Sequence, residues 1–246
     1  MRTPHAPRIV AVTVTYNPDL PSLEDLLKAL SPQVVEIIVI DNGSSNKPAI
    51  MTTGARFANC RYFWLGSNTG IANAFNRGII EARELGASHI ALFDQDSLPE
   101  PEMIDKLYAA TTELSRRGIK VAGVGARFVD NRMGNPPPFI RIRKLRLYRH
   151  VCRQGSIVPV DYLISSGSLI SEHVLSVVGG MNTDLFIDYV DIEWGLRAKG
   201  KGYQSFGVCD ATMKHALGSE PLALLGYKLP VRSPLRHYYM FRNAVW

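Results

Sequence analysis

The chain predicts an α/β fold with a mainly parallel sheet, because apolar strands and amphipathic helices alternate along its first half. Residues 9–15 and 34–40 are runs rich in Val and Ile that end in turn residues, as buried strands do. Between them, leucines recur at helical spacing, at Leu20, Leu23, Leu26, Leu27 and Leu30. The same alternation predicts a third strand over 61–65, a long helix over 71–85 and a fourth strand over 89–93.

Beyond the fourth strand the pattern becomes less regular. A helix over 99–117 and a strand over 121–124 complete the first half. Residues 128–159 have no helical period and contain three consecutive prolines, so we expect an excursion over the surface that includes an edge hairpin. Strand signal returns at 160–170 and is followed by a helix over 171–178.

The last elements are a short helix that begins near Tyr189 and a strand over 203–208. A connector, 209–214, then leads to His215. The chain ends at Trp246 inside an amphipathic pattern, which is compatible with a truncated C-terminus.

Composition excludes several classes of protein. With 46% hydrophobic and 20% charged residues the chain is an ordinary globular sequence, and no apolar run approaches the roughly 18 residues of a spanning helix. The first eight residues lack the apolar segment of a signal peptide. Cys60, Cys152 and Cys209 are far apart, with no metal or disulfide spacing, which fits a reducing cytoplasm.

The positive charge is local. The formal net charge is +6, and residues 141–153 supply six of the Lys and Arg residues with no acid. Apolar residues interleave with these bases, so the segment suits an anionic membrane surface. A solvated edge strand whose charges prevent aggregation is an equal alternative. Nucleic acid is a weaker candidate, because no nucleic-acid-binding motif accompanies the basic segment.

Two carboxylates, Asp94 and Asp96, directly follow the fourth strand. In open α/β sheets, ligands bind at the carboxyl ends of the strands. Two acids one residue apart repel each other unless a cation lies between them and a phosphate, and hard divalent metals prefer such oxygen ligands. The pair therefore predicts either a metal site or a solvated turn before Pro99.

A second acidic cluster lies at 184–193. If a helix begins near Tyr189, Asp191 lies in its first turn and Glu193 points about 200° around the axis from it. One can then face a cleft as a base while the other caps the helix or pairs with Arg197. The helix dipole alone also favours acids in a first turn.

Three further positions are candidates with open alternatives. Asp41 ends the second strand, where its carboxylate either binds a nucleotide base or ribose or forms an Asx turn. Asn68 and Gly70 precede the long helix, where the alternatives are a plain cap and a phosphate site. His215 becomes a metal ligand only if it meets Asp96 across the cleft.

Taken in order, several stretches resemble inverting family 2 glycosyltransferases with the GT-A fold. They are residues 15–17, 40–44, 68–72, 94–96 and 179–181. Three more resemble bacterial rhamnosyltransferases, at residues 186–194, 214–218 and 236–243. The resemblance spans nearly the whole chain in one consistent order, and no dinucleotide fingerprint, phosphate loop or nucleophile elbow competes with it.

The resemblance implies roles for matching residues. Asp94 would touch the ribose or the metal, and Asp96 would bind Mg²⁺ or Mn²⁺ on the diphosphate, with His215 as a further metal or diphosphate ligand. Asp191 matches the general base, and Asp188 is the fallback, because this chain lacks the Glu-Asp pair of many relatives. The implied donor-binding residues are Thr15, Tyr16, Asn17, Asp41, Asn68, Gly70, Asn73, Asp94 and Gln95.

The family also implies an activity and its partners. We expect metal-dependent transfer of a sugar with inversion, with L-rhamnose moved from dTDP-L-rhamnose to a lipid-linked glycan such as an O-antigen. The expected location is the cytoplasm or the inner face of its membrane. The membrane helices and Gln-x-x-Arg-Trp motif of processive relatives are absent from the sequence. One domain over 1–246 is expected, with a nucleotide-binding half over 1–126 and an acceptor-binding half over 127–246.

Two other functions remain as alternatives. A sugar-phosphate nucleotidyltransferase shares this architecture, but its Gly-rich basic signature is missing from residues 13–19. A non-catalytic module that binds sugar nucleotides is the second.

Overall fold

The computed structural model describes residues 6–129, 139–143, 146–215, 222–224, 227–229 and 233–245. The helices are α1 (Leu20–Leu30), α2 (Lys47–Gly54), α3 (Ile71–Glu84), α4 (Met103–Arg116), α5 (Glu172–Val178), α6 (Val190–Gly200) and α7 (Pro234–Ala244), with a 3₁₀ turn over Thr183–Leu185. The strands are β1 (Ile9–Thr15), β2 (Glu36–Asp41), β3 (Cys60–Trp64), β4 (His89–Asp94), β5 (Ser97–Pro99), β6 (Val121–Val129), β7 (Phe139–Arg143), β8 (Arg146–His150), β9 (Ile157–Val160), β10 (Ser168–Ser171), β11 (Gln204–His215), β12 (Leu222–Leu224) and β13 (Tyr227–Leu229).

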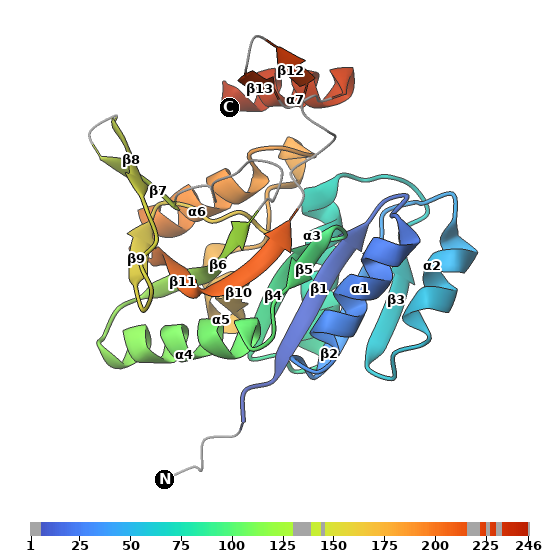
Figure 1. Ribbon diagram of the computed structural model, residues 1–246, viewed down its shortest axis with the longest axis horizontal. Coiled ribbons are helices and arrows are strands. Elements are labelled where there is room, and N and C mark those ends of the chain that lie inside the picture. Colours follow the sequence, from blue (N-terminus) through green and yellow to red (C-terminus); the bar gives the residue numbers. More distant parts are fainter. Residues whose placement is uncertain are drawn as a thin grey trace.

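A large sheet organises the molecule, in the order β3-β2-β1-β4-β10-β6-β11-β5, with β9 also paired to β11 (Figure 1). The first four strands are parallel, and β11 runs parallel to β6. β10 is antiparallel to both of its neighbours, as are β5 and β9 to β11. The predicted α/β class is confirmed.

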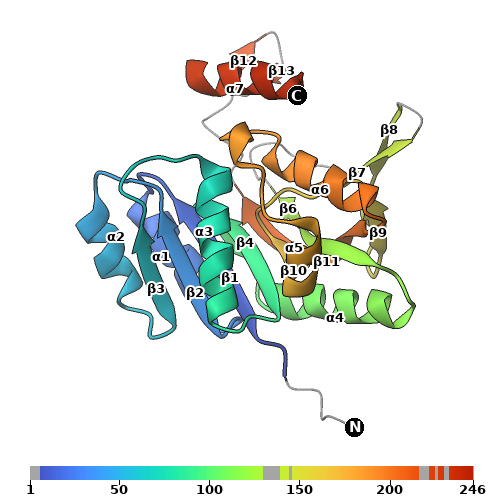
Figure 2. The ribbon, with the colours of Figure 1, turned by 180° about the vertical axis from the view of Figure 1, so that it is seen from behind.

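Helices cover both faces of this sheet. One core packs α1, α2 and α4 against it, and Figure 1 shows this side. The other core packs α3, α5 and α6 on the reverse side, which faces the viewer in Figure 2. Helix α1 shows how the sequence produces this packing. Asp19 caps it by accepting from the Ser22 N–H at 3.0 Å, and four of its periodic leucines are fully buried, namely Leu23, Leu26, Leu27 and Leu30.

Three predicted element boundaries are wrong, because pairing between strands that are distant in the sequence sets where these elements begin and end. The helix expected over 99–117 begins only at Met103, since Ser97–Pro99 pair with the end of β11. The connector 209–214 is strand, because β11 continues through a register shift between Val208 and Thr212. The strand signal over 160–170 belongs to two strands, β9 and β10, on either side of a loop.

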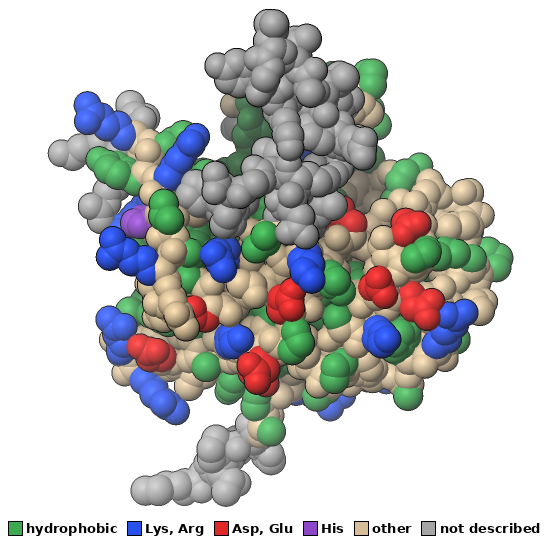
Figure 3. All heavy atoms as spheres, in the orientation of Figure 1, with side chains coloured by type: hydrophobic (Ala, Val, Ile, Leu, Met, Phe, Trp, Pro, Cys, Tyr) green, Lys and Arg blue, Asp and Glu red, His purple; other side chains and the backbone are tan. Residues whose placement is uncertain are grey.

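The expected surface excursion with an edge hairpin is confirmed in the part of it that the structure describes. Strands β7 and β8 pair as an antiparallel hairpin. Buried Asp161 anchors it, because its carboxylate accepts from the Ile142 N–H and from Lys199 Nζ at 2.7 Å. Basic side chains gather over this hairpin (Figure 3), and Arg146 and Arg149 are exposed. Contact of this hairpin with a membrane stays a prediction.

None of the helices in the described ranges is long and apolar enough to cross a membrane.

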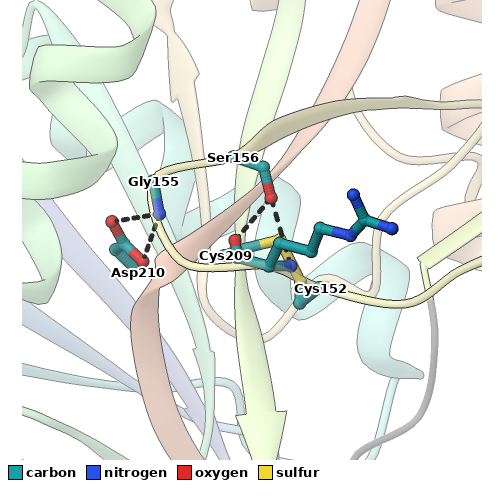
Figure 4. Close-up of a disulfide and its surroundings, with 6 residues drawn as sticks. Cys152, Gly155, Ser156, Cys209 and Asp210 are labelled. Carbon is teal, nitrogen blue, oxygen red and sulfur yellow. Dashed lines mark hydrogen bonds between the residues drawn. A yellow bond between two sulfur atoms is a disulfide. The ribbon is translucent and has the colours of Figure 1, made fainter.

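The structure corrects the expectation about cysteines. Cys152 and Cys209 form a disulfide with sulfurs 2.12 Å apart, which ties the end of the hairpin segment to β11 (Figure 4). The Asp210 carboxylate accepts from the Gly155 N–H at 2.9 Å and the Cys209 N–H donates to the Ser156 carbonyl at 3.0 Å, so the loop is held beside the disulfide. Spacing could not reveal a pair separated by 57 residues that only the fold brings together.

Reducing this disulfide is expected to destabilise the fold. Opening a loop of 57 residues removes about 4 kcal/mol in the chain-entropy account, on the order of 10 °C in Tm. Thermal unfolding with and without dithiothreitol measures the effect, and the Cys152→Ser variant should resemble the reduced protein. Cys60→Ser is the control, because burial raises the pKa of that thiol to about 12 and leaves it unreactive. If dithiothreitol left the Tm of the wild type unchanged, the result would contradict the Cys152–Cys209 disulfide.

Candidate active site

A cavity of about 660 Å³ opens at the carboxyl ends of β1 and β4. Strand order reverses between these two strands, which is where open α/β sheets bind ligands. The described residues that line it come from seven segments of the chain: Val14, Tyr16, Asn42, Asn68, Gly70, Ile71, Phe75, Asp94, Gln95, Asp96, Ile164, Ser165, Phe186, Ile187, Asp188, Tyr189, Val190, Asp191, Ile192, Arg236 and Met240.

The loop that carries Asp94 and Asp96 is fixed at both ends. Gln95 Oε1 accepts from the backbone N–H of Tyr16 at 2.7 Å, which ties the loop to the end of β1. On the other side, Ser166 Oγ accepts from the Asp94 N–H at 3.1 Å and bonds Ser97 Oγ at 2.5 Å. Both carboxylates therefore project from a loop whose backbone has little freedom, and both line the cavity.

Asp191 brings a third carboxylate to the same cavity from the first turn of α6. Its Oδ1 accepts from the Ile192 N–H at 2.9 Å. Burial, with a smaller contribution from the negative charge of Asp94, raises the pKa of the Asp191 carboxyl to about 6. Such a carboxylate is ionised at neutral pH yet basic enough to accept a proton.

Glu193 does a different job, as the helical geometry predicts. Its carboxylate pairs with both ends of the Arg197 guanidinium, at 2.7 and 2.9 Å. Arg197 also donates to the carbonyls of Val178 and Gly180 at 2.7 Å. The pair therefore docks α6 against the end of α5 and holds no place in the cavity lining.

The turn that leads into α6 has an unusual backbone. Phe186, Asp188 and Tyr189 all have φ between 62° and 64°, a left-handed conformation that is rare outside glycine. The Asp188 carboxylate accepts from Arg236 of α7 at 2.7 and 3.3 Å. The Asp188 carboxylate is therefore held by the Arg236 guanidinium, so the geometry favours Asp191 over Asp188 as the base.

Sequence comparison places this chain in a known family. Residues 10–174 match the model of the family described as Glycosyl transferase family 2. The chain belongs to this glycosyltransferase family. It is 37% identical over 238 residues to the dTDP-rhamnosyl transferase RfbF of Shigella flexneri, across 96% of this chain and 78% of that protein. It is also 26% identical to an N-acetylglucosaminyl-diphospho-decaprenol L-rhamnosyltransferase of Mycobacterium tuberculosis, across 87% of this chain and 79% of that protein.

Solved structures share the fold of this glycosyltransferase. A crystal structure of GalNAc-T7 with UDP, GalNAc and Mn²⁺ matches 99% of this chain and 49% of that chain, with a TM-score of 0.70 and 14% identity. Residues 1–349 of TarS from Staphylococcus aureus match 85% of this chain and 60% of that chain, with a TM-score of 0.59 and 14% identity. These likenesses confirm the predicted GT-A fold.

Several residues that the sequence assigned to the donor do reach the cavity of the glycosyltransferase. Tyr16, Asn68, Gly70 and Gln95 line it beside Asp94. Gly70 must be glycine: its φ is +87°, and a Cβ there would lie 2.7 Å from the Phe186 carbonyl oxygen.

Four other predicted donor-binding residues are not among the residues that line the cavity. Asp41 has no exposed surface, and its carboxylate accepts from the Ser44 N–H at 2.8 Å and the Tyr62 hydroxyl at 2.5 Å. Contact between Asp41 and the donor's base thus stays a prediction that needs Tyr62 or the loop to move. Thr15 is fully buried, Asn17 orders the Ser45 turn through its Oδ1, and Asn73 is exposed on α3 outside the lining.

His215 ends β11, where its backbone pairs with Ser97, one residue beyond Asp96. This register brings the histidine to the neighbourhood of the acidic loop. Its side chain lies outside the described part of the structure, so its role as a ligand stays a prediction.

Sequence reasoning missed Asn42 and Arg236 as site residues. Asn42 Oδ1 accepts from the Thr69 N–H at 2.9 Å and its Nδ2 donates to Asn68 Oδ1 at 3.0 Å, which joins the turns after β2 and β3. Arg236 lay within a stretch that resembled rhamnosyltransferases, but nothing in its spacing connected it to Asp188.

The residues present fit a divalent cation only if the substrate completes its coordination. Among the described residues, no group of three His, Cys, Asp or Glu side chains forms a metal site. Asp94 and Asp96 nevertheless both line the cavity. Mg²⁺ is commonly held by one or two carboxylates together with substrate phosphates and water, which is the donor set available here.

Proposed function

We propose that this glycosyltransferase is a metal-dependent inverting rhamnosyltransferase that moves L-rhamnose from dTDP-L-rhamnose to a hydroxyl of a glycan. The observation that carries the reaction is that Asp191 faces the same cavity as Asp94 and Asp96, but from a different element. The names of the Shigella and mycobacterial relatives support rhamnose as the sugar.

Asp191 takes the proton of the acceptor hydroxyl as that oxygen attacks the anomeric carbon. Its pKa of about 6 lets the carboxylate stay ionised at neutral pH and still accept the proton. A positioned base of this kind contributes about 10²–10⁴-fold to the rate. One base acting on the face opposite the leaving group gives single displacement and inversion.

Asp94 and Asp96 would hold the cation on the donor's diphosphate. When bound, a divalent ion acts as a Lewis acid that stabilises the negative charge of the leaving diphosphate. The charges of the cavity support this assignment: within the described residues, its lining carries four aspartates and one arginine, Arg236. A doubly charged diphosphate would be repelled from such a lining unless a cation entered with it.

A lipid-linked acceptor in the synthesis of a surface polysaccharide fits best, with the enzyme at the inner face of the cytoplasmic membrane. The name of the mycobacterial relative includes a decaprenol-linked sugar, which supports this class of acceptor.

Thermal shifts with dTDP, UDP and GDP, each with and without Mg²⁺ or Mn²⁺, test the donor. A ligand at 100 times its Kd adds about 2.7 kcal/mol, on the order of 5–10 °C for a chain of this size. We expect the largest shift with dTDP and metal together. A larger shift with UDP or GDP would contradict dTDP-L-rhamnose as the donor but not the glycosyltransferase activity. No shift with any of the three nucleotides would contradict the proposed donor site.

A further inference from the structure

Helix α7, at the top of Figure 1, contacts the turn that precedes the base-bearing helix α6. Its residue Asn243 is buried, with 5% of its surface exposed. Buried asparagines keep their place only when their polar atoms have partners. The partners of Asn243 are backbone groups of one short segment.

The Asn243 amide is oriented by its surroundings. Its Oδ1 accepts from Arg242 Nε at 2.9 Å. Its Nδ2 donates to the carbonyls of Leu185, Ile187 and Asp188 at 2.8, 2.9 and 3.0 Å. The two N–H groups of the amide are thus shared among three carbonyls. These contacts orient the side chain so that Nδ2, and not Oδ1, faces the turn.

These three carbonyls belong to the turn with the left-handed residues. Non-glycine residues do not hold such a conformation unless their surroundings enforce it. From the opposite side, the Phe186 carbonyl accepts from the Ile71 N–H at the start of α3, at 2.7 Å. The turn is therefore held between α3 and α7, and Asp191 follows it within one helical turn.

We propose that Asn243 is a positioning residue for catalysis: its amide fixes the turn at 185–188 and so sets where Asp191 meets the acceptor hydroxyl. This inference rests on the proposed function, in which Asp191 is the base. Asn243 is not among the residues that line the cavity, so it acts through the turn and touches no substrate.

The test compares Asn243→Asp with Asn243→Gln in steady-state transfer. The aspartate keeps the shape but removes both N–H donors and sets a carboxylate against three carbonyls. Since a displacement near 1 Å costs about 10²-fold, we expect kcat to fall by about that factor, with donor KM and the dTDP–metal thermal shift retained. Glutamine keeps the donors on a longer side chain, so it should recover part of kcat.

His237→Ala is the matched control, because His237 is exposed on the same helix. If Asn243→Asp fails to fold, Tyr239→Leu replaces it, which removes the ring stacked on Phe186 at 4.7 Å and should lower kcat less steeply. Unchanged kcat in the folded variant, or a fall in donor affinity equal to the fall in kcat, would overturn the proposal. Absence of transfer by the wild type would instead count against the proposed function.

Discussion

The Asp191→Asn variant is expected to lose transfer by about 10²–10⁴-fold, because the acceptor hydroxyl then has no base at the attacking face. Donor binding should survive, since an amide of the same shape leaves Asp94, Asp96 and Gln95 in place. Initial rates of transfer and the dTDP–metal thermal shift measure the two effects separately. Full activity in Asp191→Asn would contradict the assignment of Asp191 as the general base.

Two neighbouring aspartates serve as comparisons. Asp184→Asn removes an exposed acid outside the cavity lining and should leave kcat unchanged. Asp188→Asn weakens the contact with Arg236 and should reduce kcat less than Asp191→Asn does. If Asp188→Asn were the more damaging change, the fallback residue would be the base.

The pH dependence of the wild type and of Asp191→Asn tests the same assignment, in activity and in stability. The base must be ionised, so wild-type kcat should fall roughly tenfold between pH 7 and pH 5, through the Asp191 pKa of about 6.

The pKa of Asp191 is raised above the ordinary value of 3.8, so the folded protein binds the proton more tightly than the unfolded chain. Stability from Asp191 is therefore lost as pH rises from about 4 to 6, and Asp191→Asn should unfold at a higher temperature than the wild type at pH 8.

Loss of Asp96 is the second large effect that we expect. Asp96→Asn removes one of two carboxylates available to the cation, and the Lewis acid contributes several kcal/mol to stabilising the leaving group. Transfer should fall by about 10³-fold, and the metal-dependent part of the dTDP shift should vanish. Mn²⁺ titrations in the presence of dTDP measure this directly.

Asp105→Asn is the charge-matched control, because Asp105 is exposed on α4. Its metal dependence should equal that of the wild type. A normal Mn²⁺ response in Asp96→Asn would show that the cation, if needed, is held elsewhere.

The sequence predicted those parts of the site that depend on local periodicity. Asp191 and Glu193 are assigned correctly because residues two apart in an α-helix point about 200° away from each other. Asp94 and Asp96 emerge at a strand end that hydrophobic pattern alone identifies. Parallel strands also place such ends at one edge of the sheet, so the cavity was expected where it lies.

The rest required contacts between residues far apart in the chain. Asn243 and Arg236 act on a turn about fifty residues earlier, and no period or motif connects the two. Asp41 matched a donor ligand, but the Tyr62 hydroxyl that occupies its carboxylate comes from the neighbouring strand. The disulfide and the extension of β11 likewise follow from pairing in space.

The pairing of β5 with β11 also bears on how the protein forms during synthesis. Ser97 faces His215 across the two strands, so the segment that follows Asp94 and Asp96 gains this partner only after β11 has left the ribosome. At ordinary translation rates this takes roughly ten seconds. Through that interval the acidic loop of the nascent chain lacks this strand pairing and has its hydrogen bonds to Tyr16 and Ser166 instead. This strand pairing beside the donor loop can therefore form only after residue 215 has emerged.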